Sequence, residues 1–330
     1  MKDLVSVIIP CYNAENWLKA AIDSCLQQTY SPMEIIVIDD GSTDKSLEII
    51  KSYGDAIIWE TGENQGANVA RNRGFQLSRG QYISYMDADD YILPEKIEKQ
   101  VYYIKKTGAD VVYGDWRFQK HRSDGSSYLD PVEVCGPHQD IIEFLLSGRY
   151  PWLTTIVPLF TREIVEKSGG WDENLRAGQD RDFFLSVALC GGQYSYQPGC
   201  YSVHRQHESV TISSNKPVWL NAQLSVLKKA ENRLSESNQL SMQYQKAIAH
   251  SYFTLILYWC YYLSYSKYLS MLKKIQSLDP NFEPPKNVNK LYGLLAKRLG
   301  WLTSSLLFKV LKDINYFLSG GKIGKYGVIK

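Results

Sequence analysis

The first hundred residues alternate between short apolar runs and segments with helical spacing. Runs rich in Val and Ile, such as VSVIIP at 5–10 and EIIVIDD at 34–40, are separated by helical segments of about 10 to 15 residues. Runs of this kind are typical of strands that are buried on both faces of a parallel sheet. The pattern predicts βαβ units, in which ligands bind beyond the carboxyl ends of the strands.

The pattern changes twice further along the chain. From Asp110 to Ser214 strand-like and helical segments mix, with short strands expected at 193–197 and 200–206. Beyond that point the spacing is helical, over Val218–Leu234, Met242–Leu272 and Leu291–Leu318. We therefore expect an α/β domain at 1–215, with halves at 1–110 and 111–215, and a helical C-terminal region at 216–330.

Composition narrows the function classes. The 330 residues are 44% hydrophobic, enough for a sizeable core and about two domains. The net charge of +2 gives no global basic field, so no nucleic-acid partner is expected. The six cysteines lack CxxC pairing and are expected to be reduced. The opening MKDLVSVIIP lacks the layout of a secretory signal, which favours a cytoplasmic catalytic domain.

The first candidate chemistry is an acidic cluster. In YISYMDADD at 82–90, an apolar run ends in Asp87, Asp89 and Asp90. Like charges this close resist losing water unless a cation or hydrogen-bond donors offset them. Asp87 and Asp89 offer the hard oxygen ligands that Mg²⁺ and Mn²⁺ prefer. The alternative is that the acids precede a helix beginning near Pro94, whose dipole favours negative charge.

Four motifs, in this order along the chain, make the prediction of a function class more specific. They are VSVIIPCYNAENWLKAAIDSCLQQTY, EIIVIDDGSTDKS, ENQGANVARNRGFQLSRGQYISYMDADD and GGWDENLRAGQDRDFFLSVALCGG. Together they resemble the inverting nucleotide-sugar transferases of glycosyltransferase family 2 over about residues 4–212. The resemblance implies the GT-A fold, a mostly parallel mixed sheet flanked by helices, here with a helical C-terminal extension. It also implies transfer from a nucleotide diphosphate sugar, with UDP as the default, assisted by Mn²⁺ or Mg²⁺.

The resemblance implies residues for the nucleotide base. Asp40 matches a carboxylate that accepts the N–H of the base, while Asp39 helps hold the loop. A turn and helix cap at Gly41–Thr43 is an additional role for the same segment. The first-strand residues that lie against the base would be Pro10, Tyr12 and Asn13, with the tyrosine ring as a stacking face.

The resemblance also implies residues for the rest of the donor. Gly66 lets the backbone approach closely, and Arg71 matches an arginine that supports the donor site, with an ordinary surface arginine as the alternative. Asp87, Ala88 and Asp89 match the DxD segment that contacts ribose and metal. The ion would neutralise charge as the nucleotide leaves.

A general base is implied for the acceptor hydroxyl. Asp180 matches the Asp of the family's Glu-Asp pair at the start of a helix, whereas Gln179 replaces the Glu. Asp182 is the rival for the role. Both acids would also be favourable in the first turn of any helix.

A late segment, CYSVHRQHESVT, resembles the family loop that closes over the diphosphate. We expect His207, rather than His204, to approach the phosphates or the metal, and Arg205 to contact a phosphate. A lone surface histidine is the alternative.

The C-terminal region is aromatic and basic. The apolar stretch at 247–269 contains His250 and several serines and tyrosines, so a buried or interfacial helix is expected rather than a membrane span. Members of this layout extend lipid-linked or cell-surface glycans, which favours docking on anionic lipid through Trp259, Trp301 and Phe308. The basic residues near the headgroups would be Lys297, Arg298, Lys309, Lys312, Lys322, Lys325 and Lys330. Packing on the catalytic domain or into a homodimer is the alternative.

Other classes fit less well. A dinucleotide-dependent oxidoreductase should carry GxGxxG after its first strand, where this chain has PCYNAEN. A nucleotidyltransferase would need a Gly- and Lys/Arg-rich loop at that place. A catalytically silent binding protein stays open, although Asp40, Asp87, Asp89 and Asp180 occur together.

Overall fold

The computed structural model describes residues 3–122, 124–207, 215–285 and 290–318. These residues form two compact units. The first is Met1–Ile141 with Tyr150–Thr211, and the second is Ile142–Arg149 with Ile212–Lys330. This clustering differs from a simple division at 215 because the short segment Ile142–Arg149 groups with the C-terminal helices.

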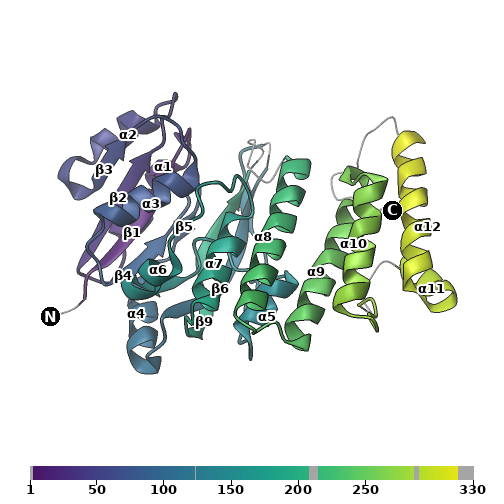
Figure 1. Cartoon of the computed structure of the whole chain (residues 1–330). Helices are drawn as coiled ribbons and strands as arrows, with labels where there is room; N and C mark the ends of the chain where they lie inside the picture. The colour runs from purple at the N-terminus through teal and green to yellow at the C-terminus, as the bar shows by residue number, and fades with distance from the viewer. Residues whose placement is uncertain (1–2, 123, 208–214, 286–289, 319–330) are drawn as a thin grey trace. The chain divides into compact units, whose positions relative to one another are not determined.

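Four parallel strands form the first part of the sheet, in the order β3-β2-β1-β4 (Figure 1). They are β1 (Val5–Cys11), β2 (Met33–Asp39), β3 (Ile58–Thr61) and β4 (Tyr82–Tyr85). All residues of β1 and β4 are buried, because helices cover both faces of the sheet. The connecting helices α1 (Leu18–Leu26), α2 (Ser46–Ser52) and α3 (Ala67–Leu77) lie between the strands, as the spacing predicts. A short 3₁₀ turn, η1 (Gly54–Ala56), follows α2.

The second part of the sheet is mixed. Antiparallel β8 joins β4 to β6, β9 runs parallel to β6, and β5 pairs antiparallel with β9. The strands are β5 (Tyr91–Ile92), β6 (Val111–His121), β7 (Ser127–Leu129), β8 (Leu159–Thr161) and β9 (Tyr194–Gln206). The helices are α4 (Lys96–Thr107), α6 (Arg162–Ser168) and α7 (Gln179–Leu189). Because Tyr91 pairs with Val203, the acidic loop at 87–90 lies beside the end of β9.

One strand replaces the two that were expected near residue 200. β9 is continuous from Tyr194 to Gln206, but its register against β6 shifts around Asp115. Gly199 there has a φ of 116°, a conformation that interrupts the regular pleat and its hydrophobic alternation. The prediction of two short strands was wrong because this irregularity resembles a turn in the sequence.

Helices make up the second unit. They are α5 (Ile141–Ser147), α8 (Lys216–Glu236), α9 (Met242–Trp259), η3 (Cys260–Tyr262), α10 (Tyr265–Leu278), α11 (Lys290–Leu299) and α12 (Trp301–Leu318). The helical regions expected over Met242–Leu272 and Leu291–Leu318 are helical, and each is divided into shorter helices. Ser264 caps the start of α10, and Gly300 adopts a φ of 75° between α11 and α12. Within the described residues, none of the helices combines the length and apolarity that crossing a bilayer needs.

Part of the expected lipid-facing surface is buried instead. Phe308, Lys309 and Lys312 are at most 4% exposed, so they cannot reach lipid headgroups as they stand. Lys309 pairs with Asp313 one turn later at 2.6 Å, and Lys312 lies 4.8 Å from the ring of Tyr261. These partners explain why a basic stretch is compatible with an interior position. Lys322, Lys325 and Lys330 lie outside the described residues.

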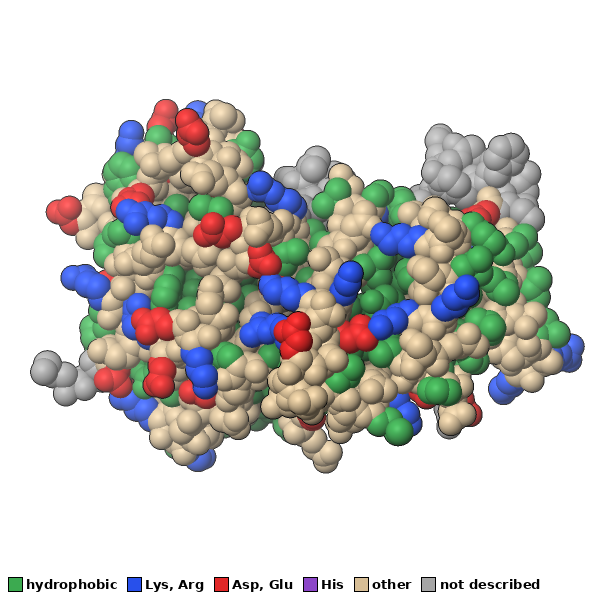
Figure 2. All heavy atoms as spheres, viewed as in Figure 1, with side chains coloured by type: hydrophobic (Ala, Val, Ile, Leu, Met, Phe, Trp, Pro, Cys, Tyr) green, Lys and Arg blue, Asp and Glu red, His purple; other side chains and the backbone are tan. Residues whose placement is uncertain are grey.

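A different apolar set is exposed on these helices. Figure 2 shows hydrophobic side chains at the surface of α12, with Lys and Arg side chains towards α11. Lys297 and Arg298 of α11 are exposed. The exposed apolar residues are Leu294, Leu299, Leu307, Val310 and Leu311, each 41–61% exposed.

A buried lysine in the first unit gives a prediction about stability. Lys96 is 1% exposed, its Nζ donates to Gln100 Oε1 at 2.8 Å, and burial lowers its pKa from 10.5 to about 7. Between these pH values the folded chain binds fewer protons than the unfolded chain, so stability should rise with pH. We expect this rise, roughly a few kcal/mol in total, to be missing in Lys96→Met.

Thermal unfolding of both proteins from pH 6 to pH 10 measures the effect. The stability of Lys96→Met relative to wild type should be highest at low pH and fall as pH increases. Lys106→Met, at an exposed position of the same helix, is the matched control. A difference between Lys96→Met and wild type that does not change with pH would contradict the prediction.

Candidate active site

Two adjacent aspartates at the carboxyl end of β2 accept hydrogen bonds from the segments at the ends of β2 and β3. Asp39 accepts the Ser42 N–H at 3.2 Å and the Thr61 hydroxyl at 2.6 Å. Asp40 accepts the N–H groups of Gln65 and Gly66, both at 2.8 Å. The two carboxylates therefore tie the loops after β2 and β3 to each other, and Asp40 is held at the strand edge where ligands bind.

Tyr12 and Asn13 follow Pro10 and Cys11 at the end of β1. Asn13 has a φ of 51°, its Oδ1 accepts the Thr43 N–H at 2.8 Å, and its N–H donates to Ser42 Oγ at 3.0 Å. The Ser42 hydroxyl therefore accepts from Asn13 and does not cap a helix, so the expected helix cap at Gly41–Thr43 was wrong. The Tyr12 ring is 52% exposed beside this braced turn, a position compatible with stacking.

Gly66 lies where two loops meet. Its φ of +103° is in the region that favours glycine, and a Cβ there would lie 2.7 Å from Arg176 Nη1. Arg176 donates from the same nitrogen to the Gln65 carbonyl at 3.0 Å. A side chain at Gly66 would therefore disturb both the approach of Arg176 and the N–H that Asp40 accepts.

Arg71 joins three elements. It is 5% exposed, and its Nη2 pairs with Asp87 Oδ1 at 2.7 Å. Its Nη1 donates to Gln179 Oε1 at 3.3 Å, and its guanidinium carbon lies 4.4 Å from the centre of the Trp171 ring. The surface-arginine alternative is therefore wrong. Gln179, at the position where a Glu was expected, accepts from this arginine as a neutral group.

Asp180 lies in the first turn of α7, as its motif predicts. The side chain is half-buried, and burial together with the nearby charge of Asp87 raises its pKa, an effect that Arg71 opposes. Asp182 in the same turn is 4% exposed. Asp180 is therefore the more accessible of the two acids, and a raised pKa makes a carboxylate a stronger base.

Basic groups at and just after the end of β9 lie beside the acidic loop. His207 Nε2 lies 3.0 Å from Asp89 Oδ2, and His204 Nδ1 lies 2.9 Å from Asp90 Oδ2. The N–H of Arg205 also donates to Asp90, at 2.9 Å. Only 9% of the His207 side chain is exposed, so the lone-surface-histidine alternative was wrong. The acids precede α4, as the alternative predicts, but strand β5 lies between them and that helix.

Each of the two histidines pairs with one carboxylate of this loop, and the pairing shifts pKa values. Burial alone would lower the pKa of His204, but the Asp90 charge and hydrogen bond raise it to about 9. The pairing with Asp90 therefore favours the charged form of the His204 imidazole. Burial would raise the pKa of Asp89, but the His207 hydrogen bond and the charges of both histidines hold it below its usual range. Asp89 is therefore ionised.

Three aromatic side chains near this loop were not predicted from the sequence: Trp17, Tyr91 and His121. Trp17, at the start of α1, stacks on His207 with centroids 5.1 Å apart and lies edge-on to His121 at 4.7 Å. The Arg205 guanidinium carbon lies 4.6 Å from the Tyr91 ring and 5.4 Å from the Trp17 ring. These contacts join residues far apart in the chain, and the only hint in the sequence is an aromatic residue four positions after Asn13.

The joined strand ends, the acidic loop after the fourth strand and the carboxylate at a helix start lie on a GT-A type fold. S. aureus TarS 1-349 in complex with UDP-GlcNAc has the same fold, with a TM-score of 0.66 at 18% identity, over 98% of this chain and 95% of that one. The mannosyltransferase PcManGT from Pyrobaculum calidifontis, in complex with GDP-Man and Mn²⁺, gives a TM-score of 0.53 at 15% identity, over 95% and 88% of the two chains. The expected GT-A fold is thereby confirmed.

Sequence comparison finds similarity to one family over part of the chain. The model of glycosyl transferase family 2 matches residues 6–157. An uncharacterized glycosyltransferase of Rickettsia typhi is 36% identical over 195 residues, which cover 58% of this chain and 60% of that protein. This similarity agrees with the resemblance that the motifs predict. The chain spans only about three fifths of the length of this relative.

Proposed function

We propose that this protein transfers a sugar from a nucleotide diphosphate donor, by default a UDP-sugar, to an acceptor hydroxyl with inversion. The observation that carries this proposal is Arg71. It pairs with Asp87 of the acidic loop and contacts Gln179, the residue next to Asp180. One buried side chain thereby holds a donor-side carboxylate near the helix start that carries the acceptor-side base, and a direct displacement needs its two substrates held close together.

Each group then has a task. Asp40 and Tyr12 bind the base, with Pro10 and Asn13 shaping the end of β1. Asp180 takes the proton from the incoming hydroxyl as the new bond to the sugar forms. Arg205 and His207 contact the diphosphate, where negative charge grows as the nucleotide leaves.

The acidic loop offers suitable ligands for Mn²⁺ or Mg²⁺. Asp89 Oδ2 and His207 Nε2 lie 3.0 Å apart and are an oxygen and an imidazole donor, which suit Mn²⁺. Among the described residues no cluster of three or more His, Cys, Asp or Glu side chains could hold a cation. We infer that Asp89 and His207 would hold the ion, with substrate phosphates completing its ligands, and that it would supply Lewis-acid stabilisation when bound.

A ligand screen tests the proposal directly. UDP-, GDP- and other nucleotide sugars are added with Mn²⁺, and thermal unfolding is followed. At least one donor should raise the melting temperature, because binding to the folded state stabilises it by mass action. Stabilisation without turnover of any donor would favour the silent binding protein, and no stabilisation by any nucleotide would contradict the proposal.

Asp40 gives a narrower prediction about the donor. Asp40→Ala should weaken UDP binding on the order of 10-fold or more, because it removes the acceptor for the base and releases the N–H groups of Gln65 and Gly66. The turnover rate at saturating donor should change little. Titration calorimetry and initial rates measure the two quantities. Unchanged UDP affinity in this variant would remove Asp40 from the base site.

The acceptor side carries exposed aromatic rings, which favours a glycan acceptor. Tyr150 and Trp152 are 52% and 49% exposed and meet edge-to-face at 4.8 Å. The Trp152 carbonyl accepts from Trp116 Nε1 at 3.0 Å, and Trp116 lies 6.1 Å from the His204 ring. Rings fixed in this way can stack on a sugar. Trp152→Ala should raise the acceptor KM and leave UDP affinity unchanged, and an unchanged acceptor KM would contradict this role.

We also propose that the enzyme works at the cytoplasmic surface of a membrane, on a lipid-linked or cell-surface glycan. The exposed apolar residues of α11 and α12 beside Lys297 and Arg298 support this, in place of the buried Phe308. Sedimentation with anionic vesicles should show salt-sensitive binding that Leu307→Ser/Leu311→Ser weakens. No binding by the full chain would contradict it, and a concentration-dependent dimer that the same variant dissociates would favour the homodimer instead.

A further inference from the structure

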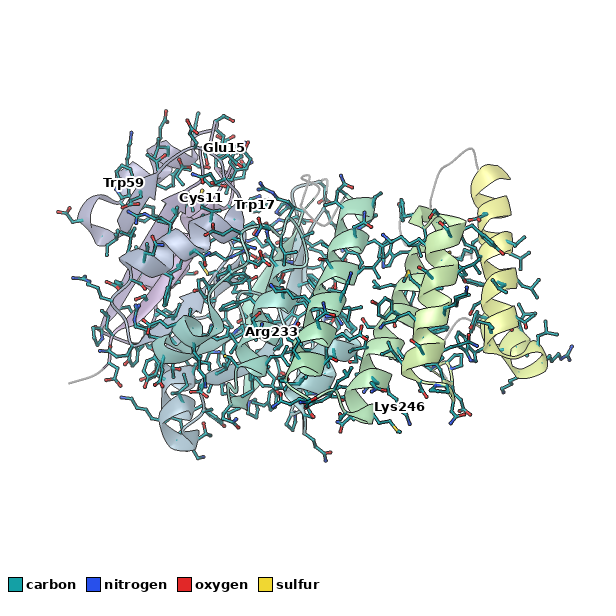
Figure 3. All side chains as sticks on the ribbon, in the orientation of Figure 1. Cys11, Glu15, Trp17, Trp59, Arg233 and Lys246 are labelled. Carbon is teal, nitrogen blue, oxygen red and sulfur yellow. The ribbon has the colours of Figure 1, made fainter. Side chains whose placement is uncertain are left out.

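A cluster of aromatic and basic side chains covers one side of the acidic loop. Trp17 lies at its centre, and Figure 3 shows it at the start of α1, well separated from Trp59 on β3. His207 stacks on Trp17 at 5.1 Å with an interplanar angle of 15°, and His121 from β6 meets it edge-on at 4.7 Å. Side chains from three segments that are distant in the chain therefore pack together and fix the position of the His207 imidazole.

Arg205 adds a positive charge to this cluster. Its guanidinium carbon lies 5.4 Å from the Trp17 ring and 4.6 Å from the Tyr91 ring. Its Nη1 donates to the Asp89 carbonyl at 3.3 Å. Cation–π contacts and one hydrogen bond thus hold the guanidinium beside the acidic loop.

Three nitrogens of this cluster are buried without a hydrogen-bond partner in the described part of the chain. They are His207 Nδ1, His121 Nε2 and Arg205 Nε. A buried nitrogen of this kind is destabilising until an acceptor or a donor reaches it. All three belong to basic side chains around one ring, so an anionic ligand with several acceptor oxygens suits them.

We propose that Trp17, braced by His121, is a positioning residue that holds His207 and Arg205 for the terminal phosphate of the donor diphosphate. This inference rests on the proposed function and deepens it. Trp17 acts through its neighbours, because the ring contacts set the orientation of the imidazole whose Nε2 faces Asp89. A smaller aliphatic side chain would leave both basic groups free to rotate, and the contribution of the second phosphate to binding would fall.

The ratio of UDP to UMP affinity is the readout, because it isolates the terminal phosphate from the base and ribose. Titration calorimetry with Mn²⁺ gives both dissociation constants for wild type and Trp17→Leu. The ratio should fall about 10-fold in Trp17→Leu, as lost cation–π and orienting contacts imply. Trp17→Phe should restore it to within about 3-fold, since a ring is again present. Trp59→Leu, a tryptophan on edge strand β3, is the matched control and should keep the wild-type ratio.

The outcomes separate this inference from the function on which it rests. If wild type binds UDP with Mn²⁺ and Trp17→Leu keeps the same ratio, the positioning role is overturned while the proposed function stands. An equal loss of UDP and UMP affinity would also overturn it, because a merely structural role acts that way. If wild type binds no nucleoside diphosphate, the proposed function fails and the inference fails with it. Should Trp17→Leu not fold, His121→Ala removes the bracing ring and must lower the same ratio.

Discussion

Asp89→Ala is expected to abolish metal-dependent sugar transfer, with a loss on the order of 10³-fold or more. Asp89 is the acid of the loop that faces His207, and it is ionised, so it is the side chain best placed to hold a cation against the diphosphate. The fold should survive, because removing one of three neighbouring carboxylates relieves repulsion. Release of nucleoside diphosphate in Mn²⁺ measures activity, and thermal unfolding checks the fold.

Two comparisons make this prediction sharp. Wild type in EDTA should behave like Asp89→Ala in Mn²⁺, because both remove the same ion. Asp55→Ala, at an exposed position in the 3₁₀ turn after α2, is the matched control and should retain wild-type rates. Full activity of wild type in EDTA would contradict the metal assignment, as would a folded Asp89→Ala variant with normal rates.

Asp180→Asn should lower the rate of transfer on the order of 10² to 10⁴-fold with UDP affinity nearly unchanged. The substitution keeps the shape of the side chain and removes its ability to accept a proton. Burial and the charge of Asp87 raise the pKa of Asp180, and such a carboxylate accepts a proton more readily than an ordinary one. Single-turnover rates with saturating donor and acceptor measure the effect, and calorimetry with UDP measures affinity.

Asp182→Asn is the control for this assignment. Asp182 lies in the same helical turn but is 4% exposed, so an acceptor hydroxyl has less access to it. We expect its transfer rate to stay much closer to wild type, with any defect seen in stability. A large loss in Asp182→Asn with most activity kept in Asp180→Asn would transfer the role of base to Asp182.

The first half of the fold is predictable because local patterns and tertiary structure agree there. The runs in β1 and β2 are buried on both faces, and apolar runs between helical segments are typical of this arrangement. The prediction fails where one backbone feature interrupts a regular element. Gly199 divides the pattern of β9, and Gly300 ends a helix whose hydrophobic spacing continues into the next one. Such breaks depend on single φ values that periodicity does not report.

The residues of the site were also predictable only in part. Motifs point to Asp40, Arg71 and Asp180, and the structure places Arg71 between Asp87 and the start of α7. These assignments stay predictions, because geometry alone does not test a catalytic role. Trp17 could not be found from sequence, since its contact with His207 requires the pairing of β5 with β9. The burial of Lys309 was not predicted either. A lysine in a basic stretch is expected at the surface, but here Lys309 pairs with Asp313, four residues later.

Turnover of a panel of nucleotide sugars by the full chain tests the central claim most directly. Purified wild type is incubated with UDP- and GDP-sugars and a mixture of glycan acceptors, with Mn²⁺ or with EDTA, and free nucleoside diphosphate is measured over time. We expect at least one UDP-sugar to be consumed with Mn²⁺, EDTA to stop the reaction, and Asp180→Asn to lack it. Absence of turnover for every donor with Mn²⁺, by a folded wild-type protein, would contradict the proposed sugar transfer.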